Sequence, residues 1–213
     1  ASSGCLHFGA GGWQVQSDGP SDDIESVVAA GVCRPLVALL AHKSSAVVIP
    51  ALRTVGNIVT GSDMQTQPII DAHALPKLLS LLESAKEEIR KDACWAISNI
   101  TAGTKEQIQA VINASILPKI MDMLVRAKKM DIRKEAAWGI SNATSGGTPE
   151  QIKYLVVQGC IPPLCALLEV QDAKIVTAAL DGLCNILDAS EWPKEQGLDI
   201  SVHAKQVPEA GGF

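Results

Sequence analysis

The sequence predicts an all-α fold: a right-handed solenoid of about four repeats, each with three helices. Apolar residues make up 47% of the 213 residues but aromatic residues only 3%, so the core must be aliphatic, which suits packed helices better than a β-sandwich. In addition, a pair of apolar residues recurs at spacings of 42, 42 and 44. These pairs are Leu39 and Leu40, Leu81 and Leu82, Met123 and Leu124, and Leu167 and Leu168.

Two further landmarks keep the same phase. An asparagine recurs at spacings of 42, 43 and 43, and a residue expected to break a helix recurs at spacings of 42, 42 and 44. Because the landmarks share one period, the sequence predicts a repeat architecture. The asparagines are Asn57, Asn99, Asn142 and Asn185, and the breaks are Gly31, His73, Ser115 and Gly159.

Each repeat is expected to begin with two short helices separated by the break. The first helix is expected over residues 20–31, 105–115 and 149–159, and the second over residues 74–82, 116–124 and 161–168. Thr104 and Thr148 each stand two residues before a glutamate, which is acceptable N-cap chemistry but not the spacing of a capping box. Prolines near the start of the second helix are tolerated, because the N–H groups of a first helical turn have no partner to lose.

The third helix of each repeat is expected to be the longest, over residues 87–103, 131–147 and 174–189. Its apolar positions recur every three and four residues, as in an amphipathic helix. The order short, short, long favours an armadillo repeat over a HEAT repeat. The repeats are expected to fill residues 17–189. Residues 1–16 are interpreted as an atypical or remnant N-terminal segment, and residues 190–213 as an irregular C-terminal tail in which a truncated repeat begins.

Charge and motifs exclude several function classes. The net charge of −5 disfavours binding to duplex DNA or an anionic membrane. The six cysteines and four histidines lack metal-ligand spacing, so we expect no metal or other cofactor, and the cysteines are interpreted mainly as small buried residues. The sequence also lacks a nucleophile motif and a phosphate-binding loop after a strand, so we do not expect the protein to be an enzyme.

The third helices carry tryptophan, asparagine and acidic residues at recurring positions. Trp95 and Trp138 each stand four residues before a phase-locked asparagine, so tryptophan and asparagine share one helix face. An acid, Asp92 or Glu135, stands three residues before each tryptophan. In the first copy Arg53 takes the tryptophan position, and in the fourth Asp181 does.

This pattern matches the chemistry of an extended basic peptide. Asparagine amides can donate to and accept from a peptide backbone, and indole faces attract the cations at the tips of lysine and arginine. The structural alternative is that tryptophan belongs to the core and asparagine bonds a neighbouring repeat. The repetition in phase favours peptide binding. Packed helices lie about 8–10 Å apart, and an extended peptide needs about three residues to span that distance, so each repeat would contact about three ligand residues.

The segments RTVGNIVTGSD, DACWAISNITAG and EAAWGISNATSGGTPEQIKYLV closely resemble importin-α (karyopherin-α), the adaptor that binds nuclear localisation signals. The resemblance covers about residues 17–189 and implies the C-terminal half of that family, with the minor signal-binding site. It implies nuclear localisation signals of cargo proteins and importin-β as partners, and the cytoplasm and nucleus as compartments. The basic segment that binds importin-β in the family is missing from this sequence.

The resemblance also implies a set of peptide-binding residues in a groove lined by tryptophan, asparagine and acids. Arg53 matches the family's interruption between its two sites, which we favour over the alternative that it pairs with an acid and orients it. A catenin-type armadillo scaffold, which would bind acidic partners, is the alternative function. The expected peptide-binding residues are Trp95, Asn99, Trp138, Asn142, Asn57, Arg53, Asp92, Glu135, Val59, Thr60, Gly61, Asp63 and Thr66.

Overall fold

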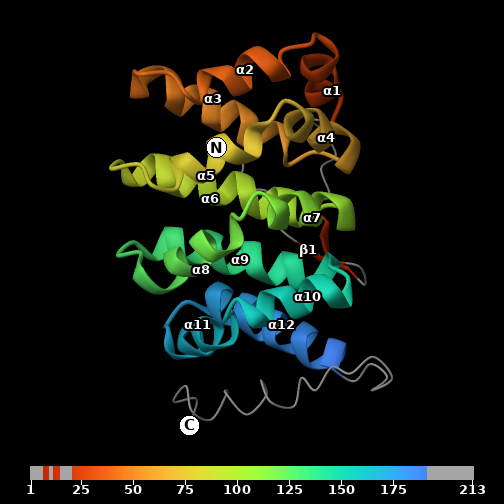
Figure 1. Ribbon diagram of the computed structural model, residues 1–213, viewed down its shortest axis with the longest axis vertical. Coiled ribbons are helices and arrows are strands. Elements are labelled where there is room, and N and C mark those ends of the chain that lie inside the picture. Colours follow the sequence, from red (N-terminus) through yellow and green to blue (C-terminus); the bar gives the residue numbers. More distant parts are fainter. Residues whose placement is uncertain (1–6, 10–11, 15–20, 191–213) are drawn as a thin grey trace.

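The computed structural model describes residues 7–9, 12–14 and 21–190. These residues form twelve α-helices, one short 3-10 helix and one β-hairpin (Figure 1). The helices are α1 Ser21–Ala29, α2 Cys33–Leu39, α3 Ser45–Ile58, α4 Asp63–Asp71, α5 Ala74–Leu81, α6 Glu87–Thr101, α7 Lys105–Asn113, α8 Leu117–Arg126, α9 Met130–Gly146, α10 Pro149–Val157, α11 Ile161–Ala166 and α12 Ala173–Ser190, with η1 at Leu167–Glu169.

The helices form four units that stack along the long axis of the molecule (Figure 1). Each unit consists of three successive helices, and its long third helix packs against the third helix of the next unit, in the order α3, α6, α9 and α12. This arrangement confirms the predicted all-α solenoid of four three-helix repeats. Its core is aliphatic, with side chains such as Leu52, Leu78 and Leu124 fully buried.

One element departs from the all-helical prediction. Strands β1 (His7–Gly9) and β2 (Gly12–Gln14) form an antiparallel hairpin, and β2 lies close to α9. The hairpin falls within residues 1–16, which remain assigned to an atypical segment only by prediction. The proposed tail over residues 190–213 lies outside the described residues from position 191 onward.

The four expected breaks all have a left-handed backbone. Gly31, His73, Ser115 and Gly159 have φ values of +74°, +62°, +55° and +85°. This conformation is open to glycine but unfavourable for other residues, so His73 and Ser115 adopt it at a cost in conformational energy. The break turns the chain sharply: α7 and α8 meet at 80°, which lets the second helix fold back onto the third.

The N-termini of the first helices differ from the prediction. Ser62, Thr104 and Thr148 each form a full capping box, whose partner is the glutamine three residues later. The expected partner of Thr104 was Glu106, whereas the partner in the structure is Gln107. The Glu106 carboxyl accepts hydrogen bonds from its own backbone N–H and from the Thr104 hydroxyl, and these bonds lower its pKa.

The capping glutamines also join neighbouring repeats. The Gln107 side-chain amide donates to the Asp63 carbonyl (2.9 Å) and to the Gln67 side chain (3.1 Å), both in the preceding repeat. The Gln151 amide repeats this arrangement with Lys105 and Gln109 at 2.9 and 3.0 Å. Gln107 and Gln151 are buried, so these bonds satisfy polar groups that would otherwise be costly to remove from water.

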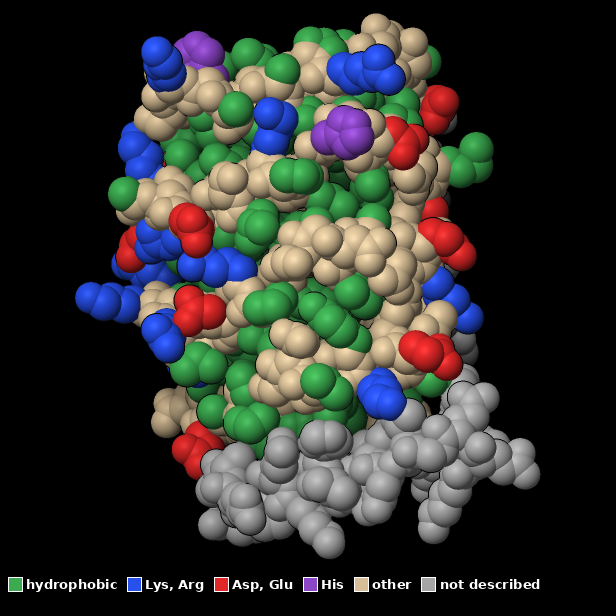
Figure 2. Space-filling model, in the orientation of Figure 1, with side chains coloured by type: hydrophobic (Ala, Val, Ile, Leu, Met, Phe, Trp, Pro, Cys, Tyr) green, Lys and Arg blue, Asp and Glu red, His purple; other side chains and the backbone are tan. Residues whose placement is uncertain are grey.

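The surface shows no uniform basic stripe in the view of Figure 2. Acidic and basic side chains are interspersed and gather mainly toward the two side edges of this face, whereas apolar and uncharged groups fill its middle. Among the described residues no single helix is long and apolar enough to cross a membrane, while the bent pairs α7–α8 and α10–α11 with η1 reach that length and composition only as pairs.

Candidate peptide-binding face of the third helices

Helices α6 and α9 present the two predicted Trp–Asn pairs. Trp95 and Asn99 lie on α6, Trp138 and Asn142 lie on α9, and all four side chains are half-buried. Positions between the members of each pair point into the core, where Ala96, Ile97 and Ile140 are fully buried. We call the surface with the two pairs the ladder face. Its half-buried indoles are anchored in the fold and still present surface to solvent.

The phase-locked asparagines do not all bond in the same way. Asn99 donates to the carbonyl of Trp95 on its own helix (2.8 Å), whereas Asn142 donates to the carbonyl of Ser98 in the preceding repeat (2.9 Å). Asn185 donates to the Thr144 hydroxyl, also one repeat earlier (3.3 Å). Asn142 and Asn185 therefore show the inter-repeat bond of the structural alternative. Each of these bonds uses only one N–H of an amide that has two N–H groups and an acceptor oxygen.

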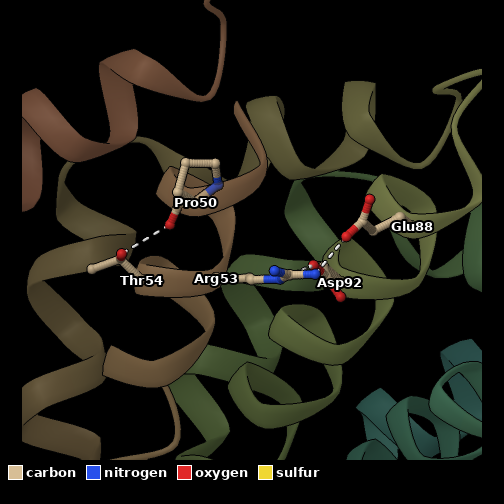
Figure 3. Close-up of polar contacts among 5 residues, drawn as sticks. All are labelled: Pro50, Arg53, Thr54, Glu88 and Asp92. Atoms are coloured by element: carbon tan, nitrogen blue, oxygen red, sulfur yellow. Dashed lines mark hydrogen bonds and ion pairs between the residues drawn. The ribbon is translucent and has the colours of Figure 1, made fainter. Parts of the chain in front are cut away.

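Arg53 on α3 is paired with acids of α6 (Figure 3). Its Nε donates to Asp92 Oδ2 at 3.2 Å, and its Nη2 donates to Glu88 Oε1. This pairing is the alternative that sequence analysis did not favour. The Asp92 side chain is only 13% exposed, so Arg53 compensates a carboxylate that has lost most of its hydration. Glu88 precedes Asp92 by one helical turn, and this spacing was the signal that sequence analysis missed.

Pro50 lies inside α3, one turn before the residues that meet α6. The Thr54 hydroxyl donates to the Pro50 carbonyl at 2.8 Å (Figure 3). Side-chain bonds of this kind are a normal way for threonine to satisfy its hydroxyl within a helix.

Glu135 is a half-buried acid on α9. Burial raises the pKa of its carboxyl above the ordinary value. Nearby Lys134 and Lys91 lower this pKa, while Asp131 and Asp92 raise it further. Burial therefore favours the neutral acid, and a cation placed beside Glu135 would favour its ionised form.

The predicted loop after α3 is less exposed than expected for a contact loop. The side chains of Val59 and Thr66 are buried, at 2% and 3% exposure, and Thr60 and Gly61 are half-buried. Asp63 is exposed, and Asn57 is exposed at the end of α3. Of these predicted residues, Val59, Thr60 and Gly61 thus lie between α3 and α4, whereas Asp63 begins α4 and Thr66 lies within it.

The structure gives a reason for a glycine at position 61 in addition to the predicted peptide contact. A Cβ at Gly61 would overlap Oε1 of Gln65, because this oxygen turns back to accept from the Ser62 N–H (3.0 Å). Gly103 stands in the same relation to Gln107. The glycine before the N-cap therefore leaves room for the capping box. The spacing Gly-Ser/Thr-x-x-Gln was visible in the sequence and would have identified it.

Cysteine chemistry adds no second site among the described residues. Cys33, Cys94, Cys160 and Cys165 are buried free thiols, whereas Cys184 is exposed. Burial raises the pKa values of Cys94 and Cys160 to about 12, so these thiols stay protonated and unreactive. The described residues contain no cluster of three or more potential metal ligands.

Comparisons with known proteins agree with this architecture. The profile of the Armadillo/beta-catenin-like repeat family matches residues 20–60, 62–102, 104–145 and 148–188. Among solved structures, the designed armadillo repeat protein YIII(Dq)4CqI has a TM-score of 0.81 at 33% identity, over 91% of this chain and 76% of that one. A designed armadillo repeat protein in complex with the peptide (KR)4 has a TM-score of 0.76 at 33% identity, over 90% of this chain and 87% of that one.

Two curated relatives from plants are similar to this chain over most of its length. Importin subunit alpha-1b of Oryza sativa subsp. japonica is 58% identical over 198 residues, which is 92% of this chain and 37% of that protein. Importin subunit alpha-3 of Arabidopsis thaliana is 53% identical over 199 residues, which is 92% of this chain and 38% of that protein. The chain thus spans less than half the length of these relatives. It belongs to the Armadillo/beta-catenin-like repeat family, and its likeness to importin subunit alpha extends over nearly all of its residues.

Proposed function

We propose that this chain is part of a nuclear import adaptor and binds Lys/Arg-rich nuclear localisation signals as extended peptides along the ladder face. The observation that carries the proposal is the pair of half-buried indoles, Trp95 and Trp138, on adjacent third helices, each one turn from an asparagine amide. Indole faces bind the cations of basic side chains, and amides pair with the peptide backbone between them.

Acids and relatives support the same ligand chemistry. Glu135 lies on the helix of Trp138, whereas Asp92 already pairs with Arg53, so we assign the ligand's cation to Glu135 in preference to Asp92. The designed neighbour that holds (KR)4 and the importin subunit alpha relatives favour a basic peptide. In the proposed role the chain provides the minor signal site, works with importin-β through segments outside this sequence, and moves between cytoplasm and nucleus.

A fluorescence anisotropy titration with a labelled (KR)4 peptide tests the proposal. We expect binding of roughly micromolar strength, about −8 kcal/mol, at low ionic strength. Affinity should fall as salt is added, because counterions screen the exposed part of the charge attraction. A labelled peptide of the same length made of alternating Asp and Glu is the control. Binding that is independent of salt, or stronger binding of the acidic peptide, would contradict the proposal and favour a catenin-type scaffold.

The affinity for (KR)4 should depend on pH through Glu135. A cationic ligand prefers the ionised carboxylate, so affinity is full above the raised pKa of Glu135 and falls as the pH drops through it. The fall therefore starts at a pH above 4.5, the ordinary value for this carboxyl. The measurement is the same titration repeated across the acidic range with (KR)4, which contains no histidine.

The Glu135→Gln variant serves as the control for this dependence, because the amide keeps the shape of the side chain but cannot titrate. We expect it to bind more weakly at neutral pH and to show a flatter pH profile. If the variant keeps the pH profile of the unchanged protein, then the titrating group is another one.

A further inference from the structure

Trp95 lies directly against the backbone of the preceding repeat. A Cβ built on Gly56 of α3 would lie 2.6 Å from Cε3 of the Trp95 ring and closer still to Cζ3. These atoms belong to the rigid six-membered ring, so a side chain at position 56 would force the whole indole to move. Gly56 lies inside a helix and is not among the residues with positive φ, so space and not backbone conformation requires a glycine there.

The other interfaces between third helices are built differently. The residue before the ladder asparagine is Gly56 in the first repeat but Ser98 in the second and Ser141 in the third. Across from these serines stand Gly139 and Gly182, where an added Cβ would meet the serine Cα atoms at ordinary distances of 3.8 and 3.7 Å. Among the described interfaces, only that between α3 and α6 therefore uses a glycine to hold an indole.

We infer that Gly56 is a positioning residue for Trp95, and that it sets the orientation in which this indole meets a basic side chain of the ligand; this inference rests on the proposed function. A cation gains from an aromatic ring only when it lies over the ring face, within about 6 Å of its centre. Contact with the α3 backbone restricts the indole before the ligand arrives, so little ordering remains to oppose binding.

The same helix also holds the acid beside this indole. Arg53 and Gly56 are one turn apart on α3, and their contacts, Asp92 and Trp95, are one turn apart on α6. The two pairs therefore lie next to each other across one helix interface. In this arrangement α3 fixes the geometry of the first tryptophan of the ladder face without contributing an aromatic side chain of its own.

The test compares Gly56→Ala with Gly139→Ala in the full chain. Both variants replace a glycine inside a third helix by a better helix former, but only the first one collides with an indole. We expect Gly56→Ala to weaken (KR)4 binding about tenfold, equal to about 1.4 kcal/mol, and Gly139→Ala to leave it within about twofold.

A second readout separates positioning from a general loss of structure. In protein labelled with ¹⁵N at tryptophan, the indole N–H signal of Trp95, assigned with a Trp95→Phe variant, should move in Gly56→Ala and stay in place in Gly139→Ala. The signal of Trp138 should stay in place in Gly56→Ala. Circular dichroism should show unchanged helix content in both variants.

The outcomes distinguish the inference from the proposed function. Equal peptide affinities of the unchanged chain and Gly56→Ala overturn the inference and leave the proposed function intact. Equal weakening by both alanine variants, or an unmoved Trp95 signal, also overturns it. If the unchanged chain binds no (KR)4 at all, the proposed function fails, and the Trp95 signal alone decides whether Gly56 positions the indole.

Discussion

Replacing both Trp95 and Trp138 by alanine should reduce the affinity for (KR)4 roughly 100-fold. Each cation over an indole contributes about 0.5–2 kcal/mol, so the loss of two such contacts accounts for about 2.7 kcal/mol. The asparagines and Glu135 stay in place and are not expected to compensate, because in the proposed role they bind the peptide backbone and one charge. The measurement is the anisotropy titration at low ionic strength, where we expect the unchanged chain to bind most tightly.

Tyr154→Ala is the matched control for this double variant. Tyr154 is also a half-buried aromatic residue, but it lies on α10, a first helix of its repeat, and not on the ladder face. It should lower stability without changing peptide affinity. Full affinity of a folded double variant would place the peptide site elsewhere on the molecule and would reject the ladder face as the site.

Replacing Gln107 by methionine should lower the free energy of unfolding by about 2–4 kcal/mol. Methionine matches the length and apolar stem of glutamine but removes both bonds to the preceding repeat and the bond from the Thr104 N–H to the Gln107 side chain, while the Thr104 hydroxyl still caps α7. Each buried polar group left without a partner costs about 1–3 kcal/mol. Urea unfolding followed by circular dichroism measures the change.

Gln158→Met is the control for that experiment, because Gln158 is exposed at the end of α10. Its effect should stay within about 0.5 kcal/mol, as is usual for surface substitutions. If the two variants have equal stability, the capping glutamines do not stabilise the repeat interfaces.

The repeat fold follows from periodic signals in the sequence. The breaks were predicted from spacing alone, and all four have positive φ, including the non-glycine residues His73 and Ser115. The Trp–Asn pairs were likewise placed on the third helices by spacing of one helical turn. Signals that depend on a fixed distance along one helix are readable from sequence, because the helix geometry converts spacing directly into a shared face.

Contacts between repeats were not readable in this way. Asn99 and Asn142 occupy equivalent positions, yet one bonds its own helix and the other bonds the preceding repeat. The pairing of Arg53 with Glu88 and Asp92 also depends on how α3 and α6 pack, and not on spacing within either helix. The sequence showed only that such groups stand in phase, so their partners had to come from the structure.

The side-chain amides that bond between repeats share one direction, opposite to that of the Arg53 ion pairs, and this direction has a consequence for synthesis. The side-chain amides of Gln107, Gln151 and Asn142 all donate to acceptors one repeat earlier in the chain. A repeat that leaves the ribosome therefore finds the acceptors of these amides already folded, and it can complete these amide bonds without waiting for later residues. Loss of an early repeat would instead leave buried N–H groups unsatisfied, whereas loss of a late one leaves carbonyl oxygens, which tolerate a missing partner better. The repeats can therefore assemble in one direction, from the N-terminal repeat toward the C-terminal one.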